Sequence, residues 1–283
     1  MKLDPTQAGR DRQSLAAALR DLRTASGLTG DRLARRCGMS QSKVSRIETG
    51  RLLPSVTDVD QILAGLGVDQ ATREELLTLA RVANTEYQDV RASVRRGLHH
   101  RQRELASLER SATHIRHFLP TLVTGLLQTP EYMHAAMNTP IEPATTDTGP
   151  AIALKLRRQA VLHDQTKSFD FLLTESAVRW QLCAPSIMAV QIDRLISLSR
   201  LRNIRIGILP LSARIPDGAY HTFVTYDARL VTIELFTGQL VLRDPKDLDH
   251  YLALFDFFGS HALWRDDARS FLNDLAGDFR DSK

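Results

Sequence analysis

The sequence predicts two domains: an all-α domain of five helices at the amino-terminal end, then an α+β domain with a mixed sheet. Three observations predict this arrangement. The chain has 283 residues, more than one hydrophobic core usually organises. Apolar residues recur at helical spacing from Gln13 to about Asn84, and strand signals begin only well beyond them. Residues 1–110 carry a net charge of +5 and the rest of the chain −1, so the two parts suit different partners.

Composition argues against several classes of protein. Hydrophobic residues make up 43% and charged residues 25%, a balance typical of globular proteins. No apolar stretch approaches the roughly 18 residues of a membrane span, and residues 1–12 lack the apolar run of a signal peptide. Cys37 and Cys183 lie far apart and outside any Cys or His cluster. We therefore expect a cytoplasmic protein without a membrane partner, a metal site or a cofactor.

Composition shifts divide the chain into four segments. We expect an N-terminal tail at 1–12, a helix-turn-helix domain at 13–84, a connector at 85–104 and an α+β domain at 105–283. The connector is rich in Arg and poor in apolar residues, so it is predicted to be a charged, solvated helix.

The stretch GLTGDRLARRCGMSQSKVSRIETG, residues 27–50, carries the most specific signal in the sequence. Thr29 is placed to cap the first of two short helices, and Gly38 between them permits a left-handed turn. Val44 and Ile47, at i and i+3, would pack the second helix on the first. Two short helices joined by a tight glycine turn form a helix-turn-helix, whose second helix enters the major groove of DNA.

Residues 13–83 resemble the Xre/Cro family of phage-repressor-type helix-turn-helix domains. The resemblance implies five helices and a homodimer on a near-palindromic operator in double-stranded DNA. It also implies base contacts from Gln41, Ser42 and Arg46. Gln suits adenine and Arg suits guanine, because each can make two parallel hydrogen bonds to one base edge. The residues expected to contact phosphates are Arg32, Lys43, Ser45, Thr49 and Arg51.

Two further positions are interpreted through the same resemblance. In the family, the residues at Arg23 and Glu48 form a mostly buried ion pair between the first and third helices, so we expect a structural role for them. The family often has Gln where Gly30 stands, and that Gln touches a phosphate and braces the recognition helix. Gly30 cannot do so, and either the affinity is lower or another side chain such as Arg32 substitutes.

Helix and strand signals alternate from Leu105 onward. The segment that contains His114 and His117 is interpreted as helical, with both imidazoles on a polar face. FDFLLTESAVRW, residues 169–180, is expected to be a strand, and the helix and apolar strand that follow it predict a parallel crossover. The segments HTFVTYD, RLVTIELF and QLVLRD then predict an antiparallel meander.

Residues 105–280 resemble a domain of unknown function that accompanies Xre-type helices in many actinobacterial regulators. The resemblance is carried by TLVTGLLQTPEYM at 121–133, RRQAVL at 157–162, LLTESAVRW at 172–180, and two longer stretches at 191–213 and 232–258. It implies a regulatory module that senses an unknown small-molecule effector, or one that binds a small protein encoded alongside it. For a protein partner, an acidic one is favoured, because it could also screen the basic face of the first domain.

Four polar residues are candidates for a ligand pocket in this domain: Glu175, Arg179, His221 and Glu234. Glu175 is expected on an apolar strand, where a buried carboxylate must be paired or must bind something. The alternative is a salt bridge to Arg179 or Arg157. No nucleophile elbow, phosphate loop, zinc-protease or dinucleotide motif occurs in the sequence, so we expect neither an enzyme nor any catalytic residue.

Together these features predict a sequence-specific DNA-binding transcription regulator whose second domain senses a ligand or a partner and dimerises. One alternative is a repressor or antitoxin-like protein whose second domain captures a small cognate protein encoded nearby. A more distant alternative is an enzyme domain fused to a DNA-binding module. An enclosed pocket would favour a small-molecule effector, whereas an exposed apolar groove would favour a protein.

Overall fold

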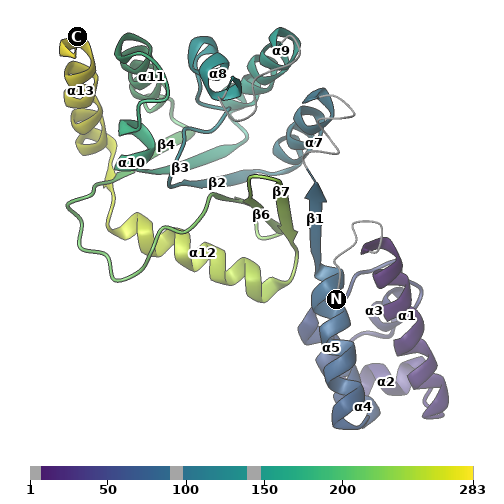
Figure 1. The fold of residues 1–283 in the computed structure, drawn as a ribbon. Coiled ribbons are helices and arrows are strands. Elements are labelled where there is room, and N and C mark those ends of the chain that lie inside the picture. Colours follow the sequence, from purple (N-terminus) through teal and green to yellow (C-terminus); the bar gives the residue numbers. More distant parts are fainter. Residues whose placement is uncertain (1–7, 90–97, 139–147, 283) are drawn as a thin grey trace. The chain divides into compact units, whose positions relative to one another are not determined.

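The computed structural model of this chain describes residues 8–89, 98–138 and 148–282 (Figure 1). They form two compact units, Met1–Asp89 with Gly238–Leu248, and Val90–Thr237 with Asp249–Lys283. Each unit has its own apolar core. Leu15, Leu33 and Ile47 are central to the first core, and Phe169 and Phe171 to the second. The first unit thus includes a segment from late in the chain.

Five helices form the body of the first unit, as predicted: α1 (Ala8–Ala25), α2 (Gly30–Arg36), α3 (Gln41–Glu48), α4 (Val56–Leu66) and α5 (Gln70–Asn84). Local capping chemistry sets their boundaries. The side chains of Thr29, Ser40, Ser55 and Asp69 each accept a backbone hydrogen bond at the start of the next helix. Gly38, at φ 64°, makes the left-handed turn between α2 and α3.

Helix α1 begins earlier than the sequence predicted. The expected tail at 1–12 is wrong for residues 8–12, which are helical, and residues 1–7 lie outside the described part of the chain. Pro5 is the last proline before this segment, and the Arg and Asp residues that follow it are compatible with a helix.

The start of the predicted helical connector is a strand. β1 (Thr85–Asp89) pairs antiparallel with β7 (Gly238–Leu242), with Tyr87 opposite Leu240. The prediction of a helix from residue 85 is therefore wrong here, because pairing with a distant strand overrides the local charge pattern. Residues 90–97 lie outside the described residues, and helix α7 (Leu98–Ser111) follows them.

The second unit is built on a mixed sheet with the strand order β6-β5-β2-β3-β4-β8. Its strands are β2 (His114–Leu119), β3 (Ser168–Thr174), β4 (Ile204–Leu209), β5 (Phe223–Tyr226), β6 (Leu230–Glu234) and β8 (Leu263–Trp264). Strands β2, β3 and β4 run parallel, and the remaining pairings are antiparallel. The predicted α+β class, the parallel crossover from β3 to β4 and the β5–β6 hairpin are all confirmed.

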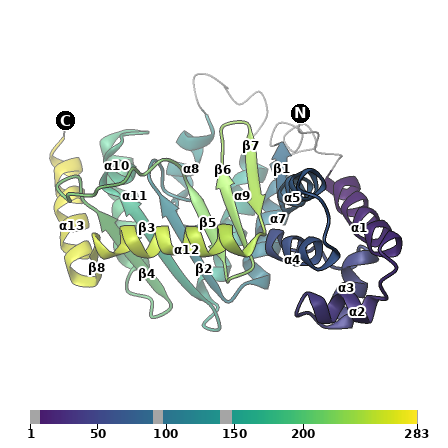
Figure 2. The ribbon, with the colours of Figure 1, turned by 90° about the horizontal axis from the view of Figure 1, so that it is seen from below.

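Helices cover both faces of this sheet. On one face lie α7, α8 (Pro130–Met137), α9 (Gly149–Arg158), α10 (Glu175–Arg179), α11 (Pro185–Leu198) and α13 (Arg265–Asp281), and on the other lies α12 (Pro245–Ser260) (Figures 1 and 2). A short 3-10 helix, Gln159–His163, follows α9. Phe118 of β2 stacks on Phe258 of α12 at 4.7 Å. Since side chains alternate along a strand, His117 points to the opposite face, toward α7 and α9.

Two local predictions in this unit are wrong. The segment 114–119 is strand β2 rather than a helix, so its two histidines do not share a polar helix face. His114 Nε2 lies 2.9 Å from the carboxylate of Asp170, whereas His117 is buried. The strand predicted through residue 180 ends at Thr174, whose hydroxyl accepts a hydrogen bond from the Ala177 N–H and starts α10.

Candidate nucleic-acid interface

Helix α3 has one face buried in the core of the first unit and one face exposed to solvent, which is called the open face below. Val44 and Ile47 are 1% and 0% exposed and belong to the core of the first unit. On the open face, Gln41, Ser42 and Arg46 are exposed, and their side chains form no hydrogen bond or ion pair with a described residue. Free polar side chains on a fixed helix face are what base recognition in a major groove requires.

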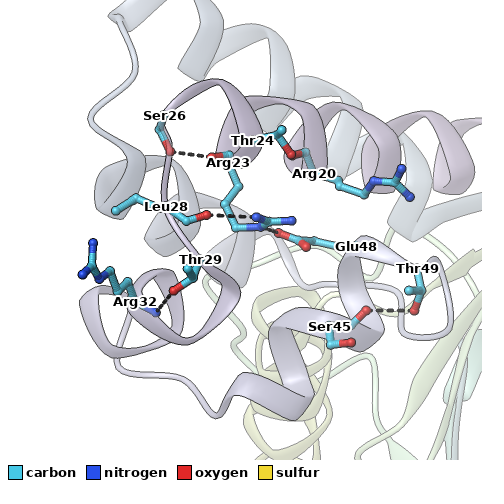
Figure 3. A network of polar contacts seen from close by, with 10 residues as sticks. All are labelled: Arg20, Arg23, Thr24, Ser26, Leu28, Thr29, Arg32, Ser45, Glu48 and Thr49. Atoms are coloured by element: carbon cyan, nitrogen blue, oxygen red, sulfur yellow. Dashed lines mark hydrogen bonds and ion pairs between the residues drawn. The ribbon is translucent and has the colours of Figure 1, made fainter.

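The ion pair expected between Arg23 and Glu48 is present and ties α1 to α3 (Figure 3). Arg23 Nε lies 2.7 Å from Glu48 Oε1, and Arg23 Nη1 donates to the Leu28 carbonyl at 2.9 Å. One guanidinium thus holds the end of the recognition helix and the turn before α2 together. Both partners point inward, so this pair positions α3 rather than offering charge to a ligand.

The five residues expected to contact phosphates differ in whether their side chains already form a hydrogen bond or an ion pair. Arg32 and Arg51 are exposed, and their side chains form no hydrogen bond or ion pair with a described residue. Lys43 Nζ is engaged by Asp58 Oδ1 at 2.6 Å, so it would have to leave that carboxylate to reach DNA. The Thr49 hydroxyl donates to the Ser45 carbonyl at 2.8 Å, while the side chain of Ser45 is exposed (Figure 3). The two unpaired arginines are therefore the strongest phosphate candidates.

Helix α2 supplies the surroundings of the open face. A Cβ added to Gly30 would lie 3.9 Å from Gln41 Nε2, so the start of α2 adjoins the start of α3. The other arginines of α2 are occupied: Arg35 pairs with Asp31 at 2.8 Å, and Arg36 donates to the Gly65 carbonyl. Arg32 is thus the side chain of α2 available for the role that Gly30 cannot fill.

The four residues predicted to form a ligand pocket in the second unit do not line one cavity. Glu175 and Arg179 pair with each other at 2.5 Å on α10, and Glu175 also accepts from the Leu211 N–H. This is the alternative that the sequence left open for Glu175. His221 shares a hydrogen bond with the Tyr251 hydroxyl. Of the four, only Glu234 lines the 290 Å³ cavity of this unit.

Five helices, a glycine turn and an open α3 face define a helix-turn-helix DNA-binding protein, and residues 14–76 match the family described as Helix-turn-helix domain. Residues 102–274 match the Domain of unknown function (DUF5753). Because that match spans more than half of the chain, the protein belongs to the DUF5753 family. Neither description assigns a role to the second unit.

Other comparisons add little. No curated protein matches the chain. The crystal structure of a phospholipase D family member, Nuc from Salmonella typhimurium, is 11% identical, with a TM-score of 0.32, over 58% of this chain and 90% of that chain; a likeness this weak supports no argument. Within the described residues no helix is long and apolar enough to cross a membrane, and no group of three or more acidic, His or Cys side chains could hold a metal ion.

Proposed function

We propose that this protein is a cytoplasmic, sequence-specific DNA-binding regulator of transcription, of the Xre/Cro type and related to the actinobacterial regulators named above. The observation that carries the proposal is the open face of α3, where Gln41, Ser42 and Arg46 are exposed and unpaired while the opposite face is buried. In this role Arg46 reads a guanine and Gln41 an adenine.

Charge supports the same role. Arg32 and Arg51 are exposed near α3 and would hold phosphates on either side of the bases that α3 reads. Such contacts fix the register of the protein on the duplex without reading its sequence, and they make the affinity fall with salt.

The proposal includes a homodimer. A single short recognition helix makes too few contacts for tight specific binding, and two-fold dimers of this class bind half-sites about 34 Å apart, or a multiple of that. The second unit would supply the dimer contact, because it has the larger surface. Sedimentation of the full chain tests this part: we expect a dimer at micromolar concentration, and a monomer that binds its operator tightly would contradict it.

The second unit would act as the sensing module. An effector that binds one dimer geometry better than another shifts DNA binding by no more than its differential affinity for the two. Capture of a small protein is the rival role, and it is favoured by the exposed apolar side chains of Leu235 and Phe236. The proposal gives neither unit a catalytic role.

The proposed function is tested by selecting duplexes that the full-length protein retains from a random pool. We expect enrichment of one near-palindromic sequence, with an affinity that falls steeply as salt rises. Retention of all duplexes alike at every salt concentration would contradict sequence-specific binding.

A further inference from the structure

The second unit holds a cavity of about 290 Å³ against one face of its sheet. His117 of β2, Tyr226 of β5 and Thr232 of β6 contribute to its floor. Glu109 of α7, Arg158 of α9 and Gln128 of the loop before α8 contribute to its walls. The cavity has room for roughly ten water molecules at about 30 Å³ each, which corresponds to a ligand of about ten to fifteen non-hydrogen atoms.

Two uncharged side chains of this cavity are buried without the hydrogen bonds they need. His117 is 3% exposed, and neither of its ring nitrogens has a partner. Its ring stacks on Phe171 at 4.8 Å, which fixes its orientation. Gln128 is 5% exposed; its Nε2 donates to the Val123 carbonyl, but its Oε1 has no partner. A buried polar atom left without a partner costs free energy, so both side chains favour an occupant that can bond to them.

The protonation state of His117 defines what it offers. Burial, together with a smaller contribution from the positive charge of Arg158, lowers the pKa of its imidazole to about 3. The ring is therefore neutral at physiological pH. A neutral imidazole has one N–H donor and one acceptor nitrogen, so an occupant must offer both a donor and an acceptor.

The lining of the cavity carries ionisable groups of both signs, and burial raises the pKa of Glu109 to about 7, so its carboxyl is partly protonated at neutral pH. Glu109 is 2% exposed, and its Oε2 lies 3.2 Å from Arg158 Nε. Lys155 and Glu234 add one further charge of each sign to the lining. An ion of either sign would meet a group of its own charge in the lining, and repulsion is strong where that group is buried, as Glu109 is. The lining thus favours an uncharged occupant.

We infer that this cavity binds a small uncharged molecule in which an N–H or O–H donor stands beside a carbonyl or hydroxyl acceptor. The donor would reach Gln128 Oε1 or the acceptor nitrogen of His117, and the acceptor would take the His117 N–H. Leu119 and Val224, which also line the cavity, would pack against an apolar part of the molecule. This inference rests on the proposed function only in identifying the molecule with the effector of the sensing module.

The test uses four probes with the same ring. Cyclohexanecarboxamide has a donor and an acceptor, its methyl ester analogue has acceptors alone, cyclohexanecarboxylate is an anion and cyclohexylmethylamine is a cation. Each is titrated into the full-length protein while the ¹⁵N shifts of the His117 ring are recorded. We expect the amide to bind, to shift both ring nitrogens and to bind at least tenfold more tightly than the ester, the anion or the cation. Failure of the amide to bind, or equal or tighter binding of any other probe, would overturn the inference.

Variants locate the site. His117→Phe keeps the stacking surface and removes both ring nitrogens, so amide binding, followed by calorimetry, should fall at least tenfold. His134→Phe, at an exposed position that does not line the cavity, should leave it unchanged. Undiminished binding by a folded His117→Phe protein would overturn the assignment; if that variant does not fold, the comparison of amide with ester on the unaltered protein decides. Binding of the unaltered protein to its operator is measured separately, without probes. Absence of operator binding would count against the proposed function and not against the binding of a molecule in the cavity.

Discussion

The carboxylate of Asp244 accepts a hydrogen bond of 2.7 Å from the backbone N–H of Val56, 188 positions away in the sequence. Val56 is the first residue of α4, where a backbone N–H has no partner within the helix. Asp244 is 4% exposed, and its second oxygen accepts from the Lys246 N–H at the start of α12 at 3.0 Å. One carboxylate thus accepts one backbone N–H at the start of each of two helices that lie far apart in the sequence.

Replacing Asp244 by Ala should therefore destabilise the first unit. The change removes both bonds and leaves the Val56 N–H without a partner, which should lower the free energy of unfolding by about 1–3 kcal/mol. Urea denaturation followed by circular dichroism measures the loss. Asp249→Ala, at an exposed position of α12, is the matched control and should change stability by less than about 0.5 kcal/mol. Equal stability of the two variants would contradict the proposed bond.

The Arg23–Glu48 pair gives a second prediction. Arg23→Ala leaves the carboxylate of Glu48, whose side chain is only 10% exposed, without its cation, so the variant should lose about 2–4 kcal/mol of stability. The double variant Arg23→Met, Glu48→Leu should recover part of this loss, because no unpaired charge is left. Thermal unfolding of the three proteins compares them. If the double variant were less stable than Arg23→Ala, the prediction would be wrong. The ion pair would then contribute more to the free energy of unfolding than the penalty for leaving the Glu48 carboxylate without its cation.

Gly30 gives a third prediction, which concerns DNA. A Cβ at this position meets only Gln41 Nε2, at an ordinary 3.9 Å, so Gly30→Gln should fold normally. The glutamine side chain could reach a phosphate, as the Gln at this position does in the Xre/Cro family that residues 13–83 resemble. It should strengthen binding to every duplex by about three- to tenfold. Gly30→Ala is the control, since it adds helix propensity without a polar group. If both variants bind alike, the missing glutamine does not limit affinity.

The cavity predicts opposite pH dependences for two variants. Burial raises the pKa of Glu109 from its ordinary 4.5 to about 7, so its contribution to stability is present at low pH and lost as pH rises through that interval. Burial lowers the pKa of His117 from 6.5 to about 3, so its contribution is present above about pH 6.5 and lost as pH falls. The two effects oppose each other between about pH 4.5 and 6.5.

Removing either group should leave the pH dependence that the other group causes uncompensated, so that it can be measured. Between these pH values, His117→Phe should become less stable as pH rises, and Glu109→Gln should become more stable, each relative to the unaltered protein by up to about 1.4 kcal/mol per pH unit. Urea midpoints measured across this range compare the proteins. Three parallel curves would show that neither group has a shifted pKa.

The helix-turn-helix was predictable because its signals are local. Thr29 and Ser40 directly precede the helices that they cap, and Gly38 lies two residues after the end of α2. The buried spacing of Val44 and Ile47 reports on the same short helices. Each local preference agrees with the final structure, so little depends on distant contacts.

The parts that the sequence did not predict depend on pairing between distant segments. β1 is a strand because β7 pairs with it, and β2 lies between β3 and β5, although its histidines and Arg116 resemble a helix surface. The cavity was missed for the same reason, since helices, strands and a loop far apart in the sequence supply its polar groups. One signal in the sequence could have identified β2: Ile115, His117 and Leu119 stand at alternating positions, and all three are buried on one face of the strand.

The central claim, that the open face of α3 reads DNA sequence, is tested most directly by comparing Arg46→Ala with Arg51→Ala. Each variant is titrated with the selected operator and with a scrambled duplex at one salt concentration. If Arg46 reads a guanine, its loss should weaken operator binding by about 1–3 kcal/mol and leave the scrambled duplex nearly unaffected, whereas Arg51→Ala should weaken both alike. An equal loss on both duplexes for Arg46→Ala would contradict base reading by α3.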